Sequence, residues 1–309
     1  MISRDDVLRA REAISGRLHR TPTFTSRTLG PGVRLKAELF QRTGSFKARG
    51  VLTKLASLSV VERERGVIGI SAGNHAQALA YGAALEGIDA LVVMWEGASV
   101  QKIAATREYG AEVDLQATGP GQAFERLGEL MEETGRALVH PFDDPLVIAG
   151  QGTVGLEILE DVPDAAVLVV PCGGGGLVSG IAAAAPGRRV IAVEPELSPA
   201  LHRGLAEGRP VPVEPQSIAD GLSAPFAGES PLAICRELGV ESVLVTEDQI
   251  AEGMRFLYTR AKLACEPAGA VGVAALLAGK VSPEEGPVAI VVSGGNVAPE
   301  TAVAILGRQ

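Results

Sequence analysis

Arg42-Thr43-Gly44-Ser45-Phe46-Lys47-Ala48-Arg49-Gly50 is the stretch around which the rest of the chain is organised. Ser45 is predicted to cap a helix, because a serine hydroxyl accepts hydrogen bonds from first-turn backbone N–H groups. Lys47 then lies in the first turn, where the helix dipole and the apolar Phe46 both disfavour an ammonium group. A neutral lysine amine is a nucleophile that forms a Schiff base with an aldehyde. Taken alone, a lysine near a helix start is usually a solvated surface charge.

The composition limits both the size class and the partners of the protein. A chain of 309 residues exceeds the usual single core, which predicts two domains or one large α/β unit. A hydrophobic fraction of 46% with 38 glycines is typical of a globular α/β enzyme. The net charge of −9 and the aromatic fraction of 4% argue against nucleic-acid binding, because neither a basic surplus nor a stacking platform is present.

The cysteines and the N-terminal residues indicate a compartment. Cys172, Cys235 and Cys265 are widely spaced, which excludes an obvious disulfide framework or zinc site and suits a reducing cytoplasm. Residues 1–6 carry acids and lack the apolar segment of a secretory signal. No apolar run approaches the length of a membrane span. We therefore expect a soluble, cytoplasmic protein without a membrane partner.

Short apolar strands alternate with helices along most of the chain, which predicts parallel sheets covered by helices on both faces. A helix over residues 3–18 and a strand over 33–39 come before the repeats, and residues 207–230 are predicted to form loops. The repeat strands are predicted at residues 67–70, 90–94, 111–115, 137–139, 167–170, 190–193, 243–245 and 288–292.

The segment Pro141-Phe142-Asp143-Asp144-Pro145 interrupts this rhythm and is interpreted as a crossing between two α/β lobes. We expect a large domain of residues 1–55 and 144–309 and a small domain of residues 56–143. A ligand cleft is expected between them.

Ligands of open α/β sheets bind beyond the carboxyl ends of the strands, and one such end here is Ser71-Ala72-Gly73-Asn74-His75. Its backbone N–H groups open a helix and are suited to binding a carboxylate. The alternative is an ordinary turn that Asn74 caps.

A second strand end is Cys172-Gly173-Gly174-Gly175-Gly176-Leu177. Ordering several glycines costs chain entropy, which suits a loop whose amides approach a phosphate at a helix start. The G-x-G-x-x-G spacing fails, because its sixth position is Val178 or Ser179, and no P-loop motif occurs. The loop therefore predicts a monophosphate site, with Cys172 a small buried residue.

The third strand end is Ser293-Gly294-Gly295-Asn296, where the serine hydroxyl can bond a heterocycle nitrogen. A reactive lysine, a monophosphate loop and a hydroxyl partner for a ring nitrogen together predict pyridoxal 5'-phosphate as cofactor.

With these motifs in order, the chain resembles the fold type II pyridoxal phosphate enzymes of the serine/threonine dehydratase and serine racemase group. The resemblance extends from residues 19–22 to 293–296 and includes Ala149-Gly150-Gln151-Gly152-Thr153 and Glu266-Pro267. It implies a tryptophan synthase beta-like α/β fold with two domains, each an open, mostly parallel sheet flanked by helices.

The resemblance also implies roles for individual residues. Lys47 carries the cofactor and is the catalytic residue, and Phe46 flanks the ring. Asn74 bonds the ring hydroxyl, Ser293 the pyridine nitrogen, and Gly221 and Glu266 lie near the ring. The phosphate is implied to lie at Gly173, Gly174, Gly175, Gly176 and Leu177, and the substrate carboxylate at Ser71, Ala72, Gly73 and His75. Without the motif, His75 is interpreted as a structural turn histidine.

The implied activity is loss of water from a β-hydroxy amino acid to give a 2-oxo acid and ammonia, with Lys47 as the base for the α-proton. A serine opposite the pyridine nitrogen favours rapid elimination over reprotonation. The preferred substrate stays open among threonine, serine, 3-hydroxyaspartate and bulkier analogues. Relatives are often dimers or tetramers, which implies a homo-oligomer.

Departures from the family pattern lead to further expectations. Ala72 stands where racemases have a second serine, so little racemisation is expected. Ala200 replaces the second acid of a divalent-cation site near Glu194, so no tight Mg²⁺ site is expected. The chain ends at Gln309 without room for an allosteric domain, so isoleucine feedback is not expected. The alternatives are an amino-acid racemase, a β-replacement enzyme of the same fold, and a non-enzymatic binding protein.

Overall fold

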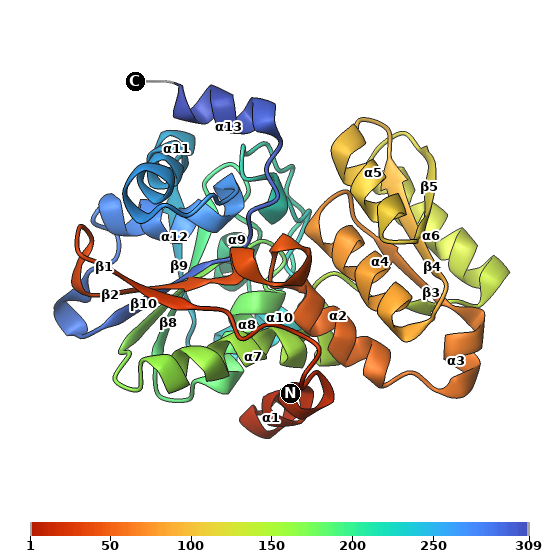
Figure 1. Cartoon of the computed structure of the whole chain (residues 1–309), viewed down its shortest axis with the longest axis horizontal. Helices are drawn as coiled ribbons and strands as arrows, with labels where there is room; N and C mark the ends of the chain where they lie inside the picture. The colour runs from red at the N-terminus through yellow and green to blue at the C-terminus, as the bar shows by residue number, and fades with distance from the viewer. Residues whose placement is uncertain (1, 308–309) are drawn as a thin grey trace.

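The computed structural model describes residues 2–307, which form two lobes, each built on its own β-sheet (Figure 1). The larger sheet has six strands in the order β1-β2-β10-β7-β8-β9, and the smaller has four in the order β5-β4-β3-β6. Neighbouring strands are parallel in every pair except β1–β2, which is antiparallel. The predicted α/β class with mostly parallel sheets is therefore confirmed.

The strands are β1 Thr23–Ser26, β2 Gly30–Ala37, β3 Val67–Ile70, β4 Ala90–Trp95, β5 Glu112–Ala117, β6 Ala137–Leu138, β7 Val167–Pro171, β8 Arg189–Pro195, β9 Glu241–Val245 and β10 Val288–Val292. The helices are α1 Arg4–Ala13, α2 Lys47–Ala56, α3 Val60–Arg65, α4 Asn74–Glu86, α5 Val100–Glu108, α6 Pro120–Thr134, α7 Pro145–Asp161, α8 Gly176–Ala184, α9 Ala200–Glu207, α10 Glu229–Glu237, α11 Glu247–Phe256, α12 Pro267–Leu277 and α13 Pro299–Leu306. Short helical turns are η1 Glu38–Phe40, η2 Arg42–Gly44, η3 Asp220–Leu222, η4 Leu257–Ala261 and η5 Pro283–Glu285.

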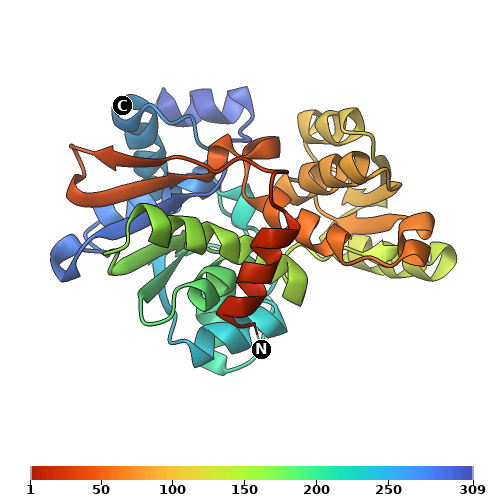
Figure 2. The same ribbon diagram turned by 60° about the horizontal axis from the view of Figure 1, so that its bottom comes forward.

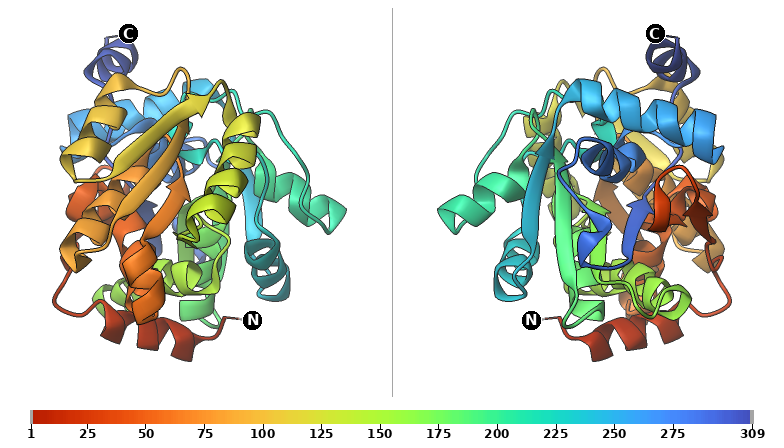
Figure 3. Two further views of the ribbon diagram at one scale, coloured as in Figure 1. Left: turned by 90° about the vertical axis from the view of Figure 1, so that its right-hand side faces the viewer. Right: turned by 90° about the vertical axis from the view of Figure 1, so that its left-hand side faces the viewer.

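Helices cover both faces of each sheet, as the two side views make clear (Figure 3). In the small lobe, α2 and α4 pack on one face of the sheet and α6 on the other. In the large lobe, α11 and α12 form a core with one face of the sheet, and α7, α8 and α10 form a second core with the other face. Strands β3, β7 and β10 are buried along their whole length, as expected for parallel strands covered on both faces.

Helix α2 lies at the junction of the two lobes (Figures 1 and 2). A Cβ atom on Gly50 would lie 2.4 Å from Gln151 Nε2, and one on Gly150 would lie 2.6 Å from the carbonyl oxygen of Arg49. These two glycines therefore allow the backbones of α2 and α7 to approach closely. The position of Lys47, at the start of α2, is fixed by this contact with the large lobe.

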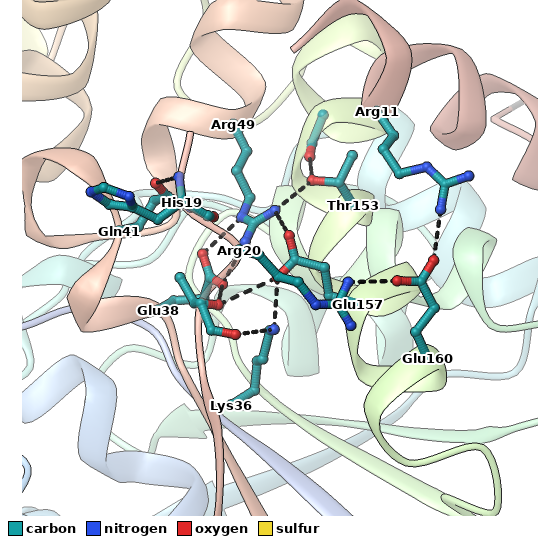
Figure 4. A network of polar contacts seen from close by, with 12 residues as sticks. Arg11, His19, Arg20, Lys36, Glu38, Gln41, Arg49, Thr153, Glu157 and Glu160 are labelled. Atoms are coloured by element: carbon teal, nitrogen blue, oxygen red, sulfur yellow. Dashed lines mark hydrogen bonds and ion pairs between the residues drawn. The ribbon is translucent and has the colours of Figure 1, made fainter. Parts of the chain in front are cut away.

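A buried ionic network around Arg49 reinforces the junction (Figure 4). Arg49 donates through Nε and Nη2 to the two carboxylate oxygens of Glu38, each at 2.8 Å. It also donates to Glu157 in α7, at 2.7 and 3.0 Å, and Lys36 Nζ lies 2.6 Å from the same carboxylate. Burial alone raises the pKa of Glu157, but the hydrogen bonds from Arg49 outweigh it and hold that pKa below its usual value.

The predicted strands of the repeats are all present, but several elements were not predicted. The sequence analysis missed β1, α3, α9, α10 and α13. The predicted helix over residues 3–18 is shorter, because α1 ends at Ala13, although its Ser3 cap is confirmed by a capping box with Asp6. The predicted loop over 207–230 contains the turn η3. Within residues 2–307, no helix is both long enough and apolar enough to span a membrane.

Candidate functional site

A cavity of about 560 Å³ lies between the two lobes, beyond the carboxyl ends of β3, β7 and β10. Its wall includes every residue that the sequence analysis assigned to the site. These are Phe46, Lys47, Ser71, Ala72, Gly73, Asn74, His75, Gly173, Gly174, Gly175, Gly176, Leu177, Gly221, Glu266 and Ser293. Segments far apart in the sequence are thus brought to one place by the two sheets.

Lys47 is the first residue of α2, so its predicted place in the first turn is confirmed. The predicted cap is wrong, because the N-cap is Phe46 and no side chain caps this helix. Ser45 instead has extended backbone angles and forms a bridge with Gly294. Its buried hydroxyl has no hydrogen-bond partner among the described residues.

The amine of Lys47 is buried between the lobes. Its Nζ donates a hydrogen bond to the carbonyl oxygen of Pro141 at 2.8 Å and lies 5.1 Å from the centroid of the Phe46 ring. Burial lowers the pKa of Lys47 to about 8, against the opposing attraction of Glu266. A substantial share of neutral amine near physiological pH makes Lys47 a competent nucleophile and base.

The chain after β10 runs alongside the turn that precedes Lys47. Phe46 N donates to the carbonyl oxygen of Ser293 at 3.2 Å, and Gly295 N donates to that of Gly44 at 2.9 Å. A Cβ atom on Gly294 would lie 2.4 Å from Glu266 Oε1. Glycine at position 294 therefore lets Glu266 approach the backbone next to Ser293.

A chain of side-chain amides connects this segment to α4. Asn296 Nδ2 donates to Asn74 Oδ1 at 2.8 Å, and Asn74 Nδ2 donates to Glu266 Oε1 at 2.7 Å. The alternative interpretation of Asn74 as a helix cap is wrong, since the N-cap of α4 is Gly73. Burial raises the pKa of Glu266 to about 7, and repulsion from Asp220 adds to this effect.

His75 is anchored by its ring. Its Nε2 atom donates to the carbonyl oxygen of Val139 at 2.8 Å, which joins the start of α4 to the end of β6. Burial, and then repulsion from Lys47, lower the pKa of His75 to about 3. The ring is therefore neutral at physiological pH and supports the 71–75 loop.

The glycine run between β7 and α8 is demanded by its neighbours. A Cβ atom on Gly174 would lie 2.4 Å from the Phe142 ring, and one on Gly176 would lie 2.8 Å from the carbonyl oxygen of Phe142. Gly175 has a φ of 93°, a left-handed conformation that favours glycine. The first-turn amides of α8 lack intrahelical partners and, together with the dipole, form an anion site at the cavity wall.

Sequence reasoning missed the residues that join the lobes across the cavity. Lys102 in α5 forms an ion pair with Asp220 in η3. The ring centroid of Phe226 lies 6.1 Å from that of Phe124 in α6 and 5.8 Å from that of Phe142. No local pattern distinguishes these residues from surface charges or ordinary core aromatics, because their partners are distant in sequence.

Glu194 lies outside the cavity wall and is engaged by the protein itself. Its carboxylate accepts hydrogen bonds from the backbone N–H groups of Leu201 and His202, at 2.7 and 2.8 Å, and from Ser242 Oγ at 3.0 Å. Glu194 therefore caps the start of α9, where Ala200 is the first residue.

Comparison with known proteins identifies the family. Residues 14–294 match the family model described as "Pyridoxal-phosphate dependent enzyme". This chain belongs to the pyridoxal-phosphate dependent enzyme family. The family assignment confirms the predicted cofactor, pyridoxal phosphate.

Curated relatives match this family member over nearly its whole length. The L-threonine ammonia-lyase of Thermotoga maritima is 44% identical over 306 residues, which cover 96% of this chain and 76% of the relative. The catabolic L-threonine dehydratase TdcB of Escherichia coli K12 is 41% identical over 309 residues, covering 95% of this chain and 92% of the relative.

Solved structures of related enzymes share this fold. Maize serine racemase superposes with a TM-score of 0.93 at 34% identity, covering 97% of this chain and 95% of that one. A threonine deaminase from the organism abbreviated T.th. has a TM-score of 0.89 at 41% identity, covering 96% of this chain and 99% of that one. The predicted resemblance to the fold type II serine/threonine dehydratase and serine racemase group is confirmed.

The cavity of this pyridoxal-phosphate dependent enzyme fits its cofactor. The aldehyde requires a buried amine that is neutral at moderate pH, and Lys47 has a pKa of about 8. The phosphate requires a helix N-terminus that a backbone can approach closely, and α8 begins at Gly176 in the cavity wall.

Proposed function

We propose that this enzyme removes water from a β-hydroxy amino acid, threonine or serine, to release a 2-oxo acid and ammonia. One observation carries the proposal: the buried amine of Lys47 shares a cavity with the N-terminus of α8 and with Ser293. The names of the relatives, L-threonine ammonia-lyase and L-threonine dehydratase, support the same activity.

Several residues are proposed to hold the cofactor. Lys47 would form the covalent link, and Phe46 would lie against the ring. Asn74 and Ser293 would bond the ring hydroxyl and the ring nitrogen, with Gly221 and Glu266 near the ring. The phosphate would be bound by the segment Gly173, Gly174, Gly175, Gly176 and Leu177. When bound, pyridoxal phosphate supplies an electron sink for the charge left by a departing α-proton.

The chain itself supplies the remaining chemistry. The first turn of α4 presents backbone N–H groups at Ser71, Ala72, Gly73 and His75, which are suited to hold the substrate carboxylate. Lys47 would take the α-proton, because a pKa of about 8 leaves part of the amine neutral near pH 7. Ser293 offers a hydroxyl and not a carboxylate to the ring nitrogen, which favours prompt loss of the β-hydroxyl.

We further propose the predicted division into a large domain, residues 1–55 and 144–309, and a small domain, residues 56–143. The four-stranded sheet, within residues 67–138, supports this division. A cytoplasmic homo-oligomer, dimer or tetramer, is proposed by analogy with relatives.

The activity is tested with a panel of β-hydroxy amino acids, assayed for 2-oxo acid release by the purified enzyme loaded with pyridoxal phosphate. We expect release from L-threonine or L-serine, and none from Lys47→Ala. A loaded enzyme that releases no 2-oxo acid from any member of the panel would contradict the proposal.

Racemisation is the second candidate, favoured by the superposition on maize serine racemase. Ala72 argues against it, because its methyl group cannot exchange a proton on the face of the substrate opposite Lys47. Incubation with L-serine in deuterated water, followed by chiral chromatography, is expected to yield pyruvate with little D-serine. Ala72→Ser is expected to increase the D-serine yield, and abundant D-serine from the unmodified enzyme would favour racemisation.

A further inference from the structure

Asn296 has no role in the proposed chemistry, yet it touches two segments of the cavity wall. Its Nδ2 atom donates to the carbonyl oxygen of Thr43 at 2.7 Å and to Asn74 Oδ1 at 2.8 Å. Gly44 makes room for it, because a Cβ atom there would lie 2.5 Å from Asn296 Oδ1. Asn296 thus joins the turn before Lys47 to the start of α4.

These hydrogen bonds have only one possible direction. The carbonyl oxygen of Thr43 can only accept, so the nitrogen of Asn296 must face it. The second hydrogen of that nitrogen goes to Asn74, whose oxygen is then the accepting atom. The nitrogen of Asn74 is consequently turned toward Glu266 Oε1, at 2.7 Å.

We infer that Asn296 is a positioning residue that sets the orientation of the Asn74 carboxamide toward Glu266 and the cavity. A side-chain amide that turns over exchanges a donor for an acceptor at the same place. With its nitrogen toward Glu266, Asn74 donates one hydrogen to that carboxylate and keeps a second N–H for a ligand. This inference rests on the proposed function for the identity of the ligand, the ring hydroxyl of pyridoxal phosphate.

The orientation of Asn74 also sets the proton balance of Glu266. An N–H group facing Oε1 stabilises the carboxylate, and the Asn74 bond lowers the pKa of Glu266 against the larger effect of burial. An amide oxygen at that place would instead require a proton on Glu266. The other charges that act on this group are Asp220 from η3, Lys102 from α5 and Lys47 from α2.

The test uses the holoenzyme and follows its visible absorbance against pH, together with the dissociation constant of pyridoxal phosphate. Asn296→Asp is nearly isosteric, so it preserves the packing against Gly44, but a carboxylate cannot donate to Thr43 or Asn74. We expect its spectral midpoint to move up by about one pH unit and its cofactor affinity to fall roughly tenfold, the effect of one lost hydrogen bond. Asn296→Ala is expected to shift both quantities in the same direction.

Gln41→Ala is the matched control. Gln41 supports the same turn, since its amide donates to the carbonyl oxygen of His19 at 2.7 Å and accepts from Arg42 N at 2.9 Å, but it has no bond to Asn74. We expect this variant to lower the melting temperature without moving the spectral midpoint. If Asn296 only stabilised the turn, its variants would behave in the same way, and the inference would be wrong.

A double-mutant cycle separates the two explanations further. In an Asn74→Ala background, Asn296→Ala is expected to cause little additional shift, because the residue acts through Asn74. Equal shifts in both backgrounds would overturn the inference. Failure of the unmodified protein to bind pyridoxal phosphate would instead contradict the proposed function, so the two failures are distinguishable.

Discussion

The Nζ atom of Lys47 lies 2.8 Å from the carbonyl oxygen of Pro141, in the segment that crosses from the small sheet to the large one. The helix that begins at Lys47 packs with the small lobe, while Arg49, two residues later, is held by the large lobe. The reactive amine is therefore positioned by both lobes and by the crossing between them.

The covalent link to the cofactor is expected at Lys47. Borohydride reduction of the loaded enzyme, followed by peptide mass spectrometry, is expected to place the added mass at this residue. Lys47→Arg keeps a positive charge but cannot form the link, so it is expected to stay colourless. Lys54→Arg, a change later in the same helix at a residue paired with Asp144, is expected to retain the yellow colour. Added mass at any other lysine would contradict this assignment.

The rate of cofactor attachment is expected to depend on pH through Lys47. Below its pKa of about 8 the reactive neutral fraction grows about tenfold for each pH unit, and above it the fraction levels off. Stopped-flow mixing of cofactor-free enzyme with pyridoxal phosphate measures this rate. A plateau that begins only near pH 10.5, the ordinary value for lysine, would show that burial does not perturb the amine.

The same shift predicts how stability changes with pH. Because the folded pKa of Lys47 lies below the unfolded value of 10.5, the unfolded state binds more protons between about pH 8 and 10.5. The contribution of Lys47 to stability therefore rises with pH across that window and is lost as pH falls through it. Urea unfolding of cofactor-free wild type and Lys47→Met is expected to show this slope difference, and parallel curves would contradict it.

Loss of Arg49 is expected to destabilise the junction of the lobes. Arg49→Met leaves the buried carboxylates of Glu38 and Glu157 without their main partner, a change that costs roughly 3–5 kcal/mol. The control Arg9→Met removes an exposed pair with Asp6 and is expected to cost less than about 1 kcal/mol. Denaturant unfolding compares the two, and similar losses would show that the buried network contributes no more than a surface pair.

The glycine run is expected to tolerate no side chain at position 174. Gly174→Ala places a Cβ atom 2.4 Å from the Phe142 ring, so we expect lower stability and weaker binding of pyridoxal phosphate. Adding Phe142→Leu should recover part of the lost stability by making room. Gly121→Ala, in α6 with no atom within 4 Å of the added Cβ, is expected to be neutral or stabilising. A stable Gly174→Ala variant would indicate that the loop relaxes away from Phe142.

The amino-acid sequence by itself determined the α/β class, the alternation of buried strands with helices, and the loops that carry the chemistry. These features are local, since a strand's apolar run and the glycines that follow it lie within a few residues of one another. The family motifs then marked Lys47 and the other wall residues as members of one site.

Only the tertiary structure decided which groups complete one another. The bond between Asn296 and Asn74 joins positions 222 residues apart, and Glu38, Arg49 and Glu157 meet only when α7 packs against α2. Ser45 has the sequence of a helix cap, but its pairing with Gly294 keeps it extended. Local propensities are worth about 1 kcal/mol, and the contacts between distant segments outweigh them in the folded protein.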